Sequence, residues 1–178
     1  MNVRQIVAGI ALAAMVNAAD TAQAQNPVSG TASLTKMPCQ NVQGRYSAMN
    51  QDISVGLEIV RAVAVLGHGS GAIYKNRTPA RVVCRLAPAD QSPRFRTLRL
   101  AFGFRDNDNM ASSSTIRLTI YKDGNLFEYR DITGGNKLLW NVDVSGTRSL
   151  ALQASCLRNN SYWPGCPAIY FSEETLEL

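Results

Sequence analysis

The sequence predicts an all-β fold, an antiparallel β-sandwich, on three observations. Apolar and polar residues alternate in four runs between Arg96 and Ala154, which is the period of a strand with one buried face. No stretch of helical period separates these runs, and turn sequences join them instead. The residues expected on the buried face are Leu98, Leu100, Phe102, Phe104, Ile116, Leu118, Ile120, Leu138, Trp140, Val142, Val144, Leu150, Leu152 and Ala154.

The other strands have weaker signals. Residues 55–66 have apolar side chains at both odd and even positions, which suits a strand buried on both faces or a short helix. Their content of β-branched residues favours the strand. Residues 78–86 form a strand with alternating apolar positions, and residues 168–178 supply the last strand. The polar segment 41–52 is expected to be a loop in which Tyr46 packs.

The clearest local structure is a hairpin around Asp123-Gly124, a residue pair typical of two-residue hairpin turns. A regular register from that turn pairs Ile120 with Phe127 and Leu118 with Tyr129. This register predicts that Phe127 and Tyr129 join the buried face.

Residues 1–24 have the pattern of a bacterial Sec signal peptide. Arg4 precedes an apolar run over residues 6–16, and Ala22-Gln23-Ala24 is a cleavage sequence. The run is shorter than the roughly 20 residues that span a bilayer. We expect cleavage before Gln25, no membrane span afterwards, and a periplasmic or secreted protein. The alternative is a short hydrophobic helix of the fold.

Residues 25–38 are rich in small and polar residues and predict a flexible lead-in. Residues 39–178 have the size of a single β-sandwich domain. The net charge is +5, but the basic residues are scattered, so no nucleic-acid partner is expected. The excess charge fits solubility or a mild attraction to anionic envelope polymers.

The chain has four cysteines, and an even number in an exported protein predicts two disulfides. Three connectivities exist for four cysteines. The short, loop-like segment between Cys156 and Cys166 favours their pairing, which leaves Cys39 for Cys84. A zinc site is the alternative, but the chain has no CxxC pair, and its one histidine lies far from any cysteine in sequence.

The loop closed by Cys156 and Cys166 is the main candidate site. Aromatic faces stack on the C–H groups of sugars, and amides and guanidinium groups bind hydroxyls. The alternative is a loop whose tryptophan packs on the end of the sandwich. The candidate ligand-binding residues are Arg158, Asn159, Asn160, Tyr162 and Trp163.

Two further segments are candidates. The turn from Gly67 to Gly71 contains His68, which can bind or titrate, but it lacks the glycine spacing of a nucleophile elbow and the lysine of a phosphate loop. A tight connection is its alternative role. Asp106 and Asp108, with interleaved asparagines, suit calcium, although the EF-hand pattern is absent and a solvated loop with Asx turns is the alternative.

Several segments resemble the NPCBM family, the novel putative carbohydrate-binding module. They are Gly67-His68-Gly69-Ser70, Ala-Phe-Gly-Phe at 101–104, Ile-x-Leu-x-Ile-Tyr-Lys-Asp-Gly-Asn-Leu from Ile116, Trp-Asn-Val-Asp-Val-Ser-Gly from Trp140, Thr-Arg-Ser-Leu-Ala-Leu-Gln-Ala from Thr147, and residues 170–174. The resemblance spans residues 55–178 and implies a jelly-roll, galactose-binding-like sandwich.

The function expected on these grounds is an exported, non-catalytic binding module for carbohydrate or cell-envelope glycan. The alternative is a protein-interaction module with an envelope protein as partner, such as an inhibitor, adhesin or assembly accessory. An enzyme is not expected, because the chain has one histidine, no nucleophile motif and no metal-ligand spacing. No cofactor is expected other than calcium.

Overall fold

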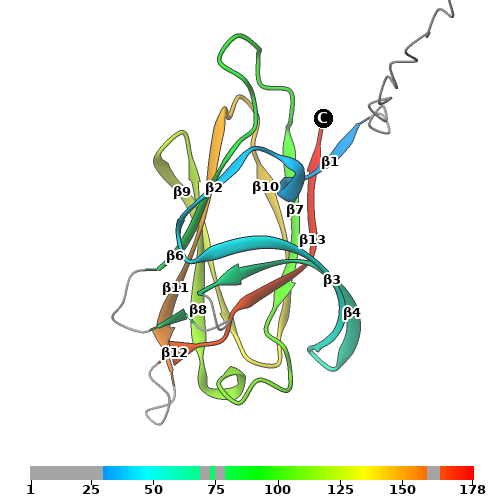
Figure 1. The fold of residues 1–178 in the computed structure, drawn as a ribbon, viewed down its shortest axis with the longest axis vertical. Coiled ribbons are helices and arrows are strands. Elements are labelled where there is room, and N and C mark those ends of the chain that lie inside the picture. Colours follow the sequence, from blue (N-terminus) through cyan, green and yellow to red (C-terminus); the bar gives the residue numbers. More distant parts are fainter. Residues whose placement is uncertain (1–29, 69–72, 75–78, 160–164) are drawn as a thin grey trace, which may run out of the picture.

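Two packed antiparallel sheets form the domain, as the sequence predicts (Figure 1). The structure, a computed structural model, describes residues 30–68, 73–74, 79–159 and 165–178. The first sheet has the order β10-β7-β13-β4-β3, with β1 paired to one end of β13. Its six strands are β1 (Thr31–Ser33), β3 (Arg45–Val55), β4 (Glu58–Gly67), β7 (Thr97–Gly103), β10 (Lys137–Asp143) and β13 (Ile169–Glu177).

The second sheet has five strands in the order β2-β6-β11-β8-β9. A separate two-stranded pair joins β5 to β12, and two short 3-10 turns, η1 and η2, lie in the connections. The remaining elements are η1 (Leu34–Lys36), β2 (Cys39–Gln43), β5 (Ile73–Tyr74), β6 (Ala80–Arg85), η2 (Ala111–Ser113), β8 (Thr115–Lys122), β9 (Asn125–Thr133), β11 (Ser149–Arg158) and β12 (Gly165–Cys166).

The core lies between the two sheets and includes the residues whose alternation predicts it. The residues of β7 and β8 expected to face inward are at most 1% exposed, and only Leu138 of β10 is partly buried. Phe102 lies near the centre, with its ring centroid 5.9 Å from that of Phe171 and 6.4 Å from that of Trp140. Edge-to-face and tilted ring contacts of this kind add to the gain from burial.

The β8–β9 hairpin has the predicted two-residue loop but not the predicted register. Lys122 pairs with Asn125, and the residues between them have the positive φ angles that such a turn requires, 49° and 83°. A bulge then shifts β9 by one residue, so that Ile120 pairs with Glu128 instead of Phe127. The prediction that Phe127 and Tyr129 are buried is therefore wrong, and they are 41% and 46% exposed.

The segment expected to be a loop, residues 41–52, instead contributes to β2 and β3. Tyr46 is buried, as predicted, but β3 lies at the edge of its sheet and carries many exposed polar side chains that mask its alternation. The strand predicted from residue 55 begins only at Glu58, because Gly56 and Leu57 form the turn between β3 and β4.

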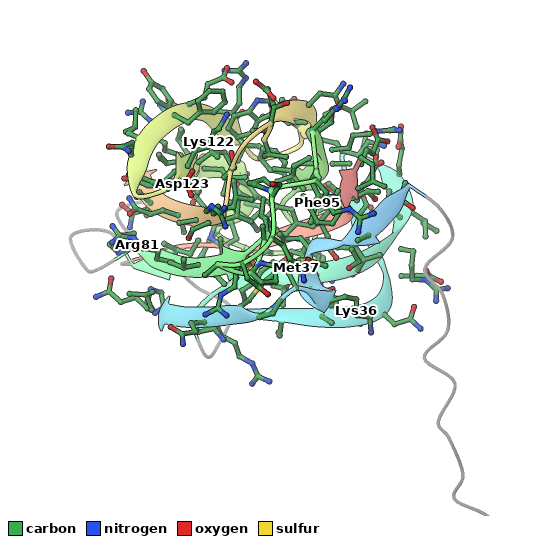
Figure 2. The ribbon with its side chains drawn as sticks, turned by 90° about the horizontal axis from the view of Figure 1, so that it is seen from above. Lys36, Met37, Arg81, Phe95, Lys122 and Asp123 are labelled. Carbon is green, nitrogen blue, oxygen red and sulfur yellow. A yellow bond between two sulfur atoms is a disulfide. The ribbon has the colours of Figure 1, made fainter. Side chains whose placement is uncertain are left out.

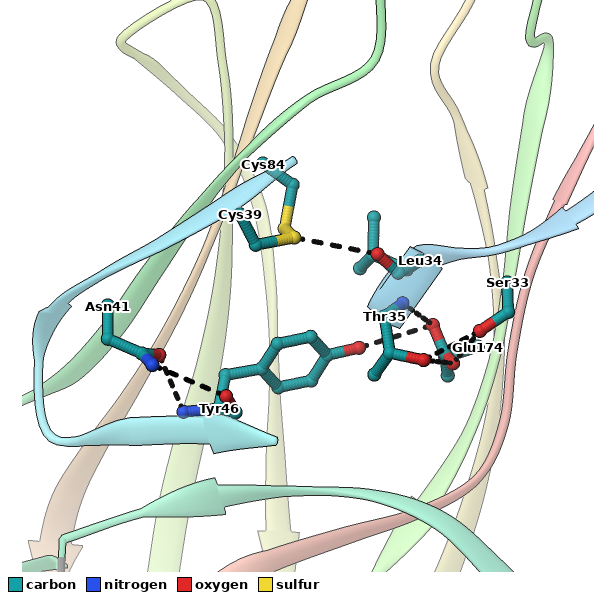
Figure 3. Close-up of a disulfide and its surroundings, with 8 residues drawn as sticks. All are labelled: Ser33, Leu34, Thr35, Cys39, Asn41, Tyr46, Cys84 and Glu174. Atoms are coloured by element: carbon teal, nitrogen blue, oxygen red, sulfur yellow. Dashed lines mark hydrogen bonds between the residues drawn. A yellow bond between two sulfur atoms is a disulfide. The ribbon is translucent and has the colours of Figure 1, made fainter. Parts of the chain in front are cut away.

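Ordered structure begins before the predicted domain boundary at Cys39. β1 pairs with β13, and Leu34 of η1 is fully buried. Figure 3 shows the carboxylate that holds this segment, Glu174 of β13, which is 3% exposed. It accepts hydrogen bonds from the Ser33 hydroxyl at 2.5 Å, the Thr35 amide at 2.9 Å and the Tyr46 hydroxyl at 3.2 Å. The expectation of a flexible lead-in therefore does not hold for residues 31–36.

Both favoured disulfides are present. Cys39 is bonded to Cys84 across β2 and β6, and Cys156 is bonded to Cys166 across β11 and β12. The first ties the outer strand of the five-stranded sheet to its neighbour, and the second closes the loop expected to bind a ligand. Among the residues that the structure describes, no helix has the length and apolar character needed to cross a membrane.

Candidate functional site

Two strands that adjoin the predicted site segments pair with each other. β5, which follows residues 67–71 in the sequence, pairs with β12, which ends the cysteine-closed loop and is labelled at the lower end of Figure 1. His68 and Asn159 are partly buried, and Arg158 is exposed. The other predicted ligand-binding residues, Asn160, Tyr162 and Trp163, lie outside the described residues. The β5–β12 pairing thus joins the strand that follows residues 67–71 in the sequence to the strand that ends the cysteine-closed loop.

Asp106 supports a turn of the fold. Its carboxylate accepts hydrogen bonds from the Ser54 hydroxyl at 2.5 Å and from the backbone amides of Gly56 and Leu57 at 2.9 Å each. These bonds, that from Ser54 above all, lower the pKa of Asp106 below its ordinary value. The carboxylate therefore stabilises the β3–β4 turn in its charged form.

Asp108 has a similar local role, because its Oδ1 accepts the Met110 amide at 2.9 Å. These bonds use oxygens of both aspartates to hold the backbone, those of Asp106 at the β3–β4 turn and that of Asp108 within its own loop. In the described part of the chain, no three or more His, Cys, Asp or Glu side chains gather as a metal site.

The best-defined polar surface lies on the outer face of the five-stranded sheet. Strand register places Arg81, Gln153, Thr119 and Tyr129 in one row across β6, β11, β8 and β9. The next row toward the cysteine-closed loop contains Ser155, Arg117 and Asp131. We call this surface the tyrosine face and define it by six residues, which are Arg81, Arg117, Tyr121, Tyr129, Asp131 and Gln153.

Arg117 joins two members of the tyrosine face. Its Nε and Nη2 donate hydrogen bonds to the two carboxylate oxygens of Asp131, at 2.8 and 2.9 Å. Its guanidinium carbon lies 3.9 Å from the centre of the Tyr129 ring. The hydrogen bonds from Arg117 lower the pKa of Asp131, so this carboxylate remains charged well into the acid range. The ring, the cation and the carboxylate are therefore held in one arrangement.

The other half of the face has a parallel arrangement. Arg81 donates from Nε to the Gln153 side-chain oxygen at 2.8 Å, and its guanidinium carbon lies 5.7 Å from the centre of the Tyr121 ring. The Gln153 amide nitrogen in turn donates to the Ser155 hydroxyl at 3.2 Å. A hollow of about 210 Å³ lies beside Tyr121 and Arg81. This half thus also combines an aromatic ring with oriented hydrogen-bonding groups.

The tyrosine face has the groups that bind sugars without reacting with them. Half-exposed aromatic rings offer surfaces for C–H groups, while the guanidinium, amide and carboxylate groups suit hydroxyls. The regular register predicted from the Asp-Gly turn did not reveal this site, because it buries Tyr129 and, continued by two residues, pairs Asp131 with Ile116. A one-residue bulge places Asp131 opposite Arg117, and that pairing of opposite charges is the signal that identifies the true register.

In sequence, the chain matches no protein-family model and no curated protein. In structure, it is similar to CBM51 from Clostridium perfringens GH95 in complex with methyl-galactose, with a TM-score of 0.54 and 14% identity over 82% of this chain and 99% of that one. The fold is shared with carbohydrate-binding modules.

A second similar structure is CBM51-2 in complex with GlcNAc, with the INT domains, from Clostridium perfringens ZmpB. Its TM-score is 0.54 and its identity 14%, over 83% of this chain and 32% of that one. This chain therefore spans about a third of the second structure and nearly all of the first. At these identities the likeness concerns the fold, and the binding chemistry has to be argued from the residues themselves.

Proposed function

We propose that the protein is an exported, non-catalytic carbohydrate-binding module that binds a glycan on the tyrosine face. The observation that carries the proposal is the position of Arg117, stacked on Tyr129 and hydrogen-bonded twice to Asp131. A site whose polar groups are already oriented loses little conformational entropy when a sugar binds. The modules similar in fold, which were solved with methyl-galactose and with GlcNAc, support a sugar as the ligand.

The cysteine-closed loop extends this site. Ser155 pairs with Arg117 in the row nearest the loop and directly precedes Cys156, so the face leads to the base of the loop. Arg158, Asn159, Asn160, Tyr162, Trp163 and His68 then contribute further contacts to a glycan longer than one sugar. The same proposal includes that the chain is a member of the NPCBM family, as the resemblance implies.

The proposal includes export of the protein to the periplasm or the medium. The pattern of residues 1–24 directs the chain out of the cytoplasm, and two disulfides are typical of oxidising compartments. The envelope glycans found there are the available partners. N-terminal sequencing of the mature protein from the producing cell tests this part, with Gln25 as the expected first residue.

A glycan array followed by calorimetry tests the function. We expect binding to at least one glycan, with an affinity that falls on substitution of Tyr121→Ala. Trp163→Ala reports on the loop, and a loss confined to long glycans is expected if the loop extends the site. Absence of binding to every glycan, combined with stoichiometric capture of one envelope protein, would replace this proposal with the protein-interaction alternative.

A further inference from the structure

A cavity lies at the end of the sandwich opposite β12. It has a volume of about 590 Å³ and lies between the β1–η1 segment, residues 86–95 after β6, and the end of β13. Its apolar lining includes Met37, Leu86 and Phe95, and its cations are Lys36 and Arg94. Figure 2, seen from above, shows Lys36, Met37 and Phe95 grouped at this end. Its volume falls in the range of small-molecule sites.

Both sides of this cavity are held by hydrogen bonds. On one side, Glu174 fixes η1 through the Thr35 amide at 2.9 Å, and the Leu178 amide donates to the Gly30 carbonyl at 2.9 Å. On the other side, Arg148 donates to the Pro88 carbonyl at 2.8 Å and holds the long loop. Because its walls are already fixed, the protein loses little conformational entropy when a ligand binds in this cavity.

The charged side chains that line the cavity have one sign. Among the described residues, neither Lys36 nor Arg94 takes part in an ion pair, although most other charged side chains of the sheets do. None of the described residues that line the cavity has an acidic side chain. Lysine and arginine beside an apolar surface favour a ligand with a carboxylate and an apolar part.

We infer that this cavity is a second binding site, separate from the tyrosine face, for an N-acylated acidic sugar. The acyl methyl group and the C–H face of the sugar pack on Phe95, Met37 and Leu86, and the carboxylate binds Lys36 and Arg94. Gln91 and Ser92, which also line the cavity, bind the hydroxyls and the amide. The site and the tyrosine face share no residue, so either can exist without the other.

A matched pair of ligands tests the inference. N-acetylmuramic acid is N-acetylglucosamine with a lactyl group that carries a carboxylate, so the two probes differ in the charge that Lys36 and Arg94 would bind. Titration of the full chain by calorimetry or NMR is expected to show at least about tenfold tighter binding of N-acetylmuramic acid. Equal affinities for the two sugars, or no binding of the acidic one, would overturn the inference.

Variants then locate the binding. Lys36→Gln with Arg94→Gln should abolish the preference for the acidic sugar, and Phe95→Ala should weaken its binding. Arg45→Gln removes one cation from an exposed position on β3 and should leave the preference intact, which controls for overall charge. Because Lys36 and Arg94 are exposed, their substitution leaves the core unchanged, and thermal unfolding of each variant verifies this.

Tyr129→Ala separates the two sites. It should leave the preference for N-acetylmuramic acid over N-acetylglucosamine unchanged, since Tyr129 lies outside the cavity that contains Lys36 and Arg94. If Tyr129→Ala abolishes that preference while the cavity variants retain it, the second site is wrong and the tyrosine face remains supported.

Discussion

The guanidinium carbon of Arg117 lies 3.9 Å from the centre of the Tyr129 ring, and Arg117 reaches that position while bonded to Asp131 through two nitrogens. Arg117 and Tyr129 come from neighbouring strands of an exposed sheet face, where a long side chain ordinarily samples several rotamers. The carboxylate removes that freedom. The side chains are thus held in place before any ligand arrives.

Asp131→Asn tests the part played by this ordering. We expect the affinity for glycan to fall about tenfold, because the amide no longer holds Arg117 in place through two charged bonds. The stability of the fold should change little, because the pair is exposed to solvent. Calorimetric titration and urea unfolding measure the two effects.

The chain offers a matched control for that variant. Arg61 makes a similar paired contact with Asp52 on the β3–β4 hairpin of the other sheet, at 2.5 and 3.1 Å. Asp52→Asn should leave glycan affinity unchanged. An equal loss in both variants would contradict the role given to the Arg117–Asp131 pair.

Glu174 should matter for stability. In Glu174→Gln the acceptor of several hydrogen bonds loses its charge, and we expect a loss of about 3 kcal/mol in the free energy of unfolding. Tyr46→Phe removes one of these donors and should cost about 1 kcal/mol. Glu177→Gln, on the same strand but in an exposed ion pair with Arg99, should cost about 0.5 kcal/mol or less. Urea unfolding in which the Glu174 and Glu177 variants are equally stable would contradict this ranking.

Much of the fold follows from the sequence, because β7, β8, β10 and β11 each bury one face and expose the other. Their alternation survives in the structure with few exceptions. The β3 strand was not predicted because it is an edge strand with many exposed polar residues, so its sequence lacks a clear alternation of apolar and polar positions. β1 and η1 were not predicted because their order depends on Glu174, which lies about 140 residues away in the chain.

The candidate site was harder to predict than the fold. The register of β9 depends on a bulge that adds one residue, and an error of one residue moves Tyr129 from solvent to core. Neither alternation nor the Asp-Gly turn reveals that bulge. The pairing of β5 with β12 could not be predicted either, since each strand is only two residues long.

The two disulfides should contribute unequally to stability. In the chain-entropy account, a crosslink stabilises by restricting the unfolded chain, and the effect grows with the length of the closed segment. Cys39 and Cys84 are 45 residues apart, and Cys156 and Cys166 are 10 apart. Paired substitution to alanine should cost about 4 kcal/mol for the first bond and about 3 kcal/mol for the second. Urea unfolding with the opposite order would show that native-state packing, and not chain entropy, dominates.

Asp106 predicts an acid-dependent loss of stability. Its pKa is lower in the folded chain than the ordinary value of 3.8, so its contribution is complete above that pH and is lost as the pH falls through the folded pKa. Asp106→Asn should flatten part of the decline in melting temperature measured between about pH 2 and 6. Asp131 and Asp143 also have lowered pKa values, so some decline should remain.

Ser54→Ala provides a graded version of the same test. It removes the donor that lowers the pKa of Asp106 most, so the loss of stability should begin at a higher pH than in the unmodified protein. An unchanged melting profile in both variants would mean that the β3–β4 turn does not depend on the charge of Asp106.

The most direct test of glycan binding on the tyrosine face compares two aromatic residues of β9. Tyr129 and Phe127 are similarly exposed, at 46% and 41%, but Tyr129 stacks under Arg117 on the face, whereas Phe127 lies under Lys122 at the bulge. Calorimetric titration with the glycan found on the array should show at least about tenfold weaker binding for Tyr129→Ala and unchanged binding for Phe127→Ala. Unchanged binding in Tyr129→Ala would contradict the account.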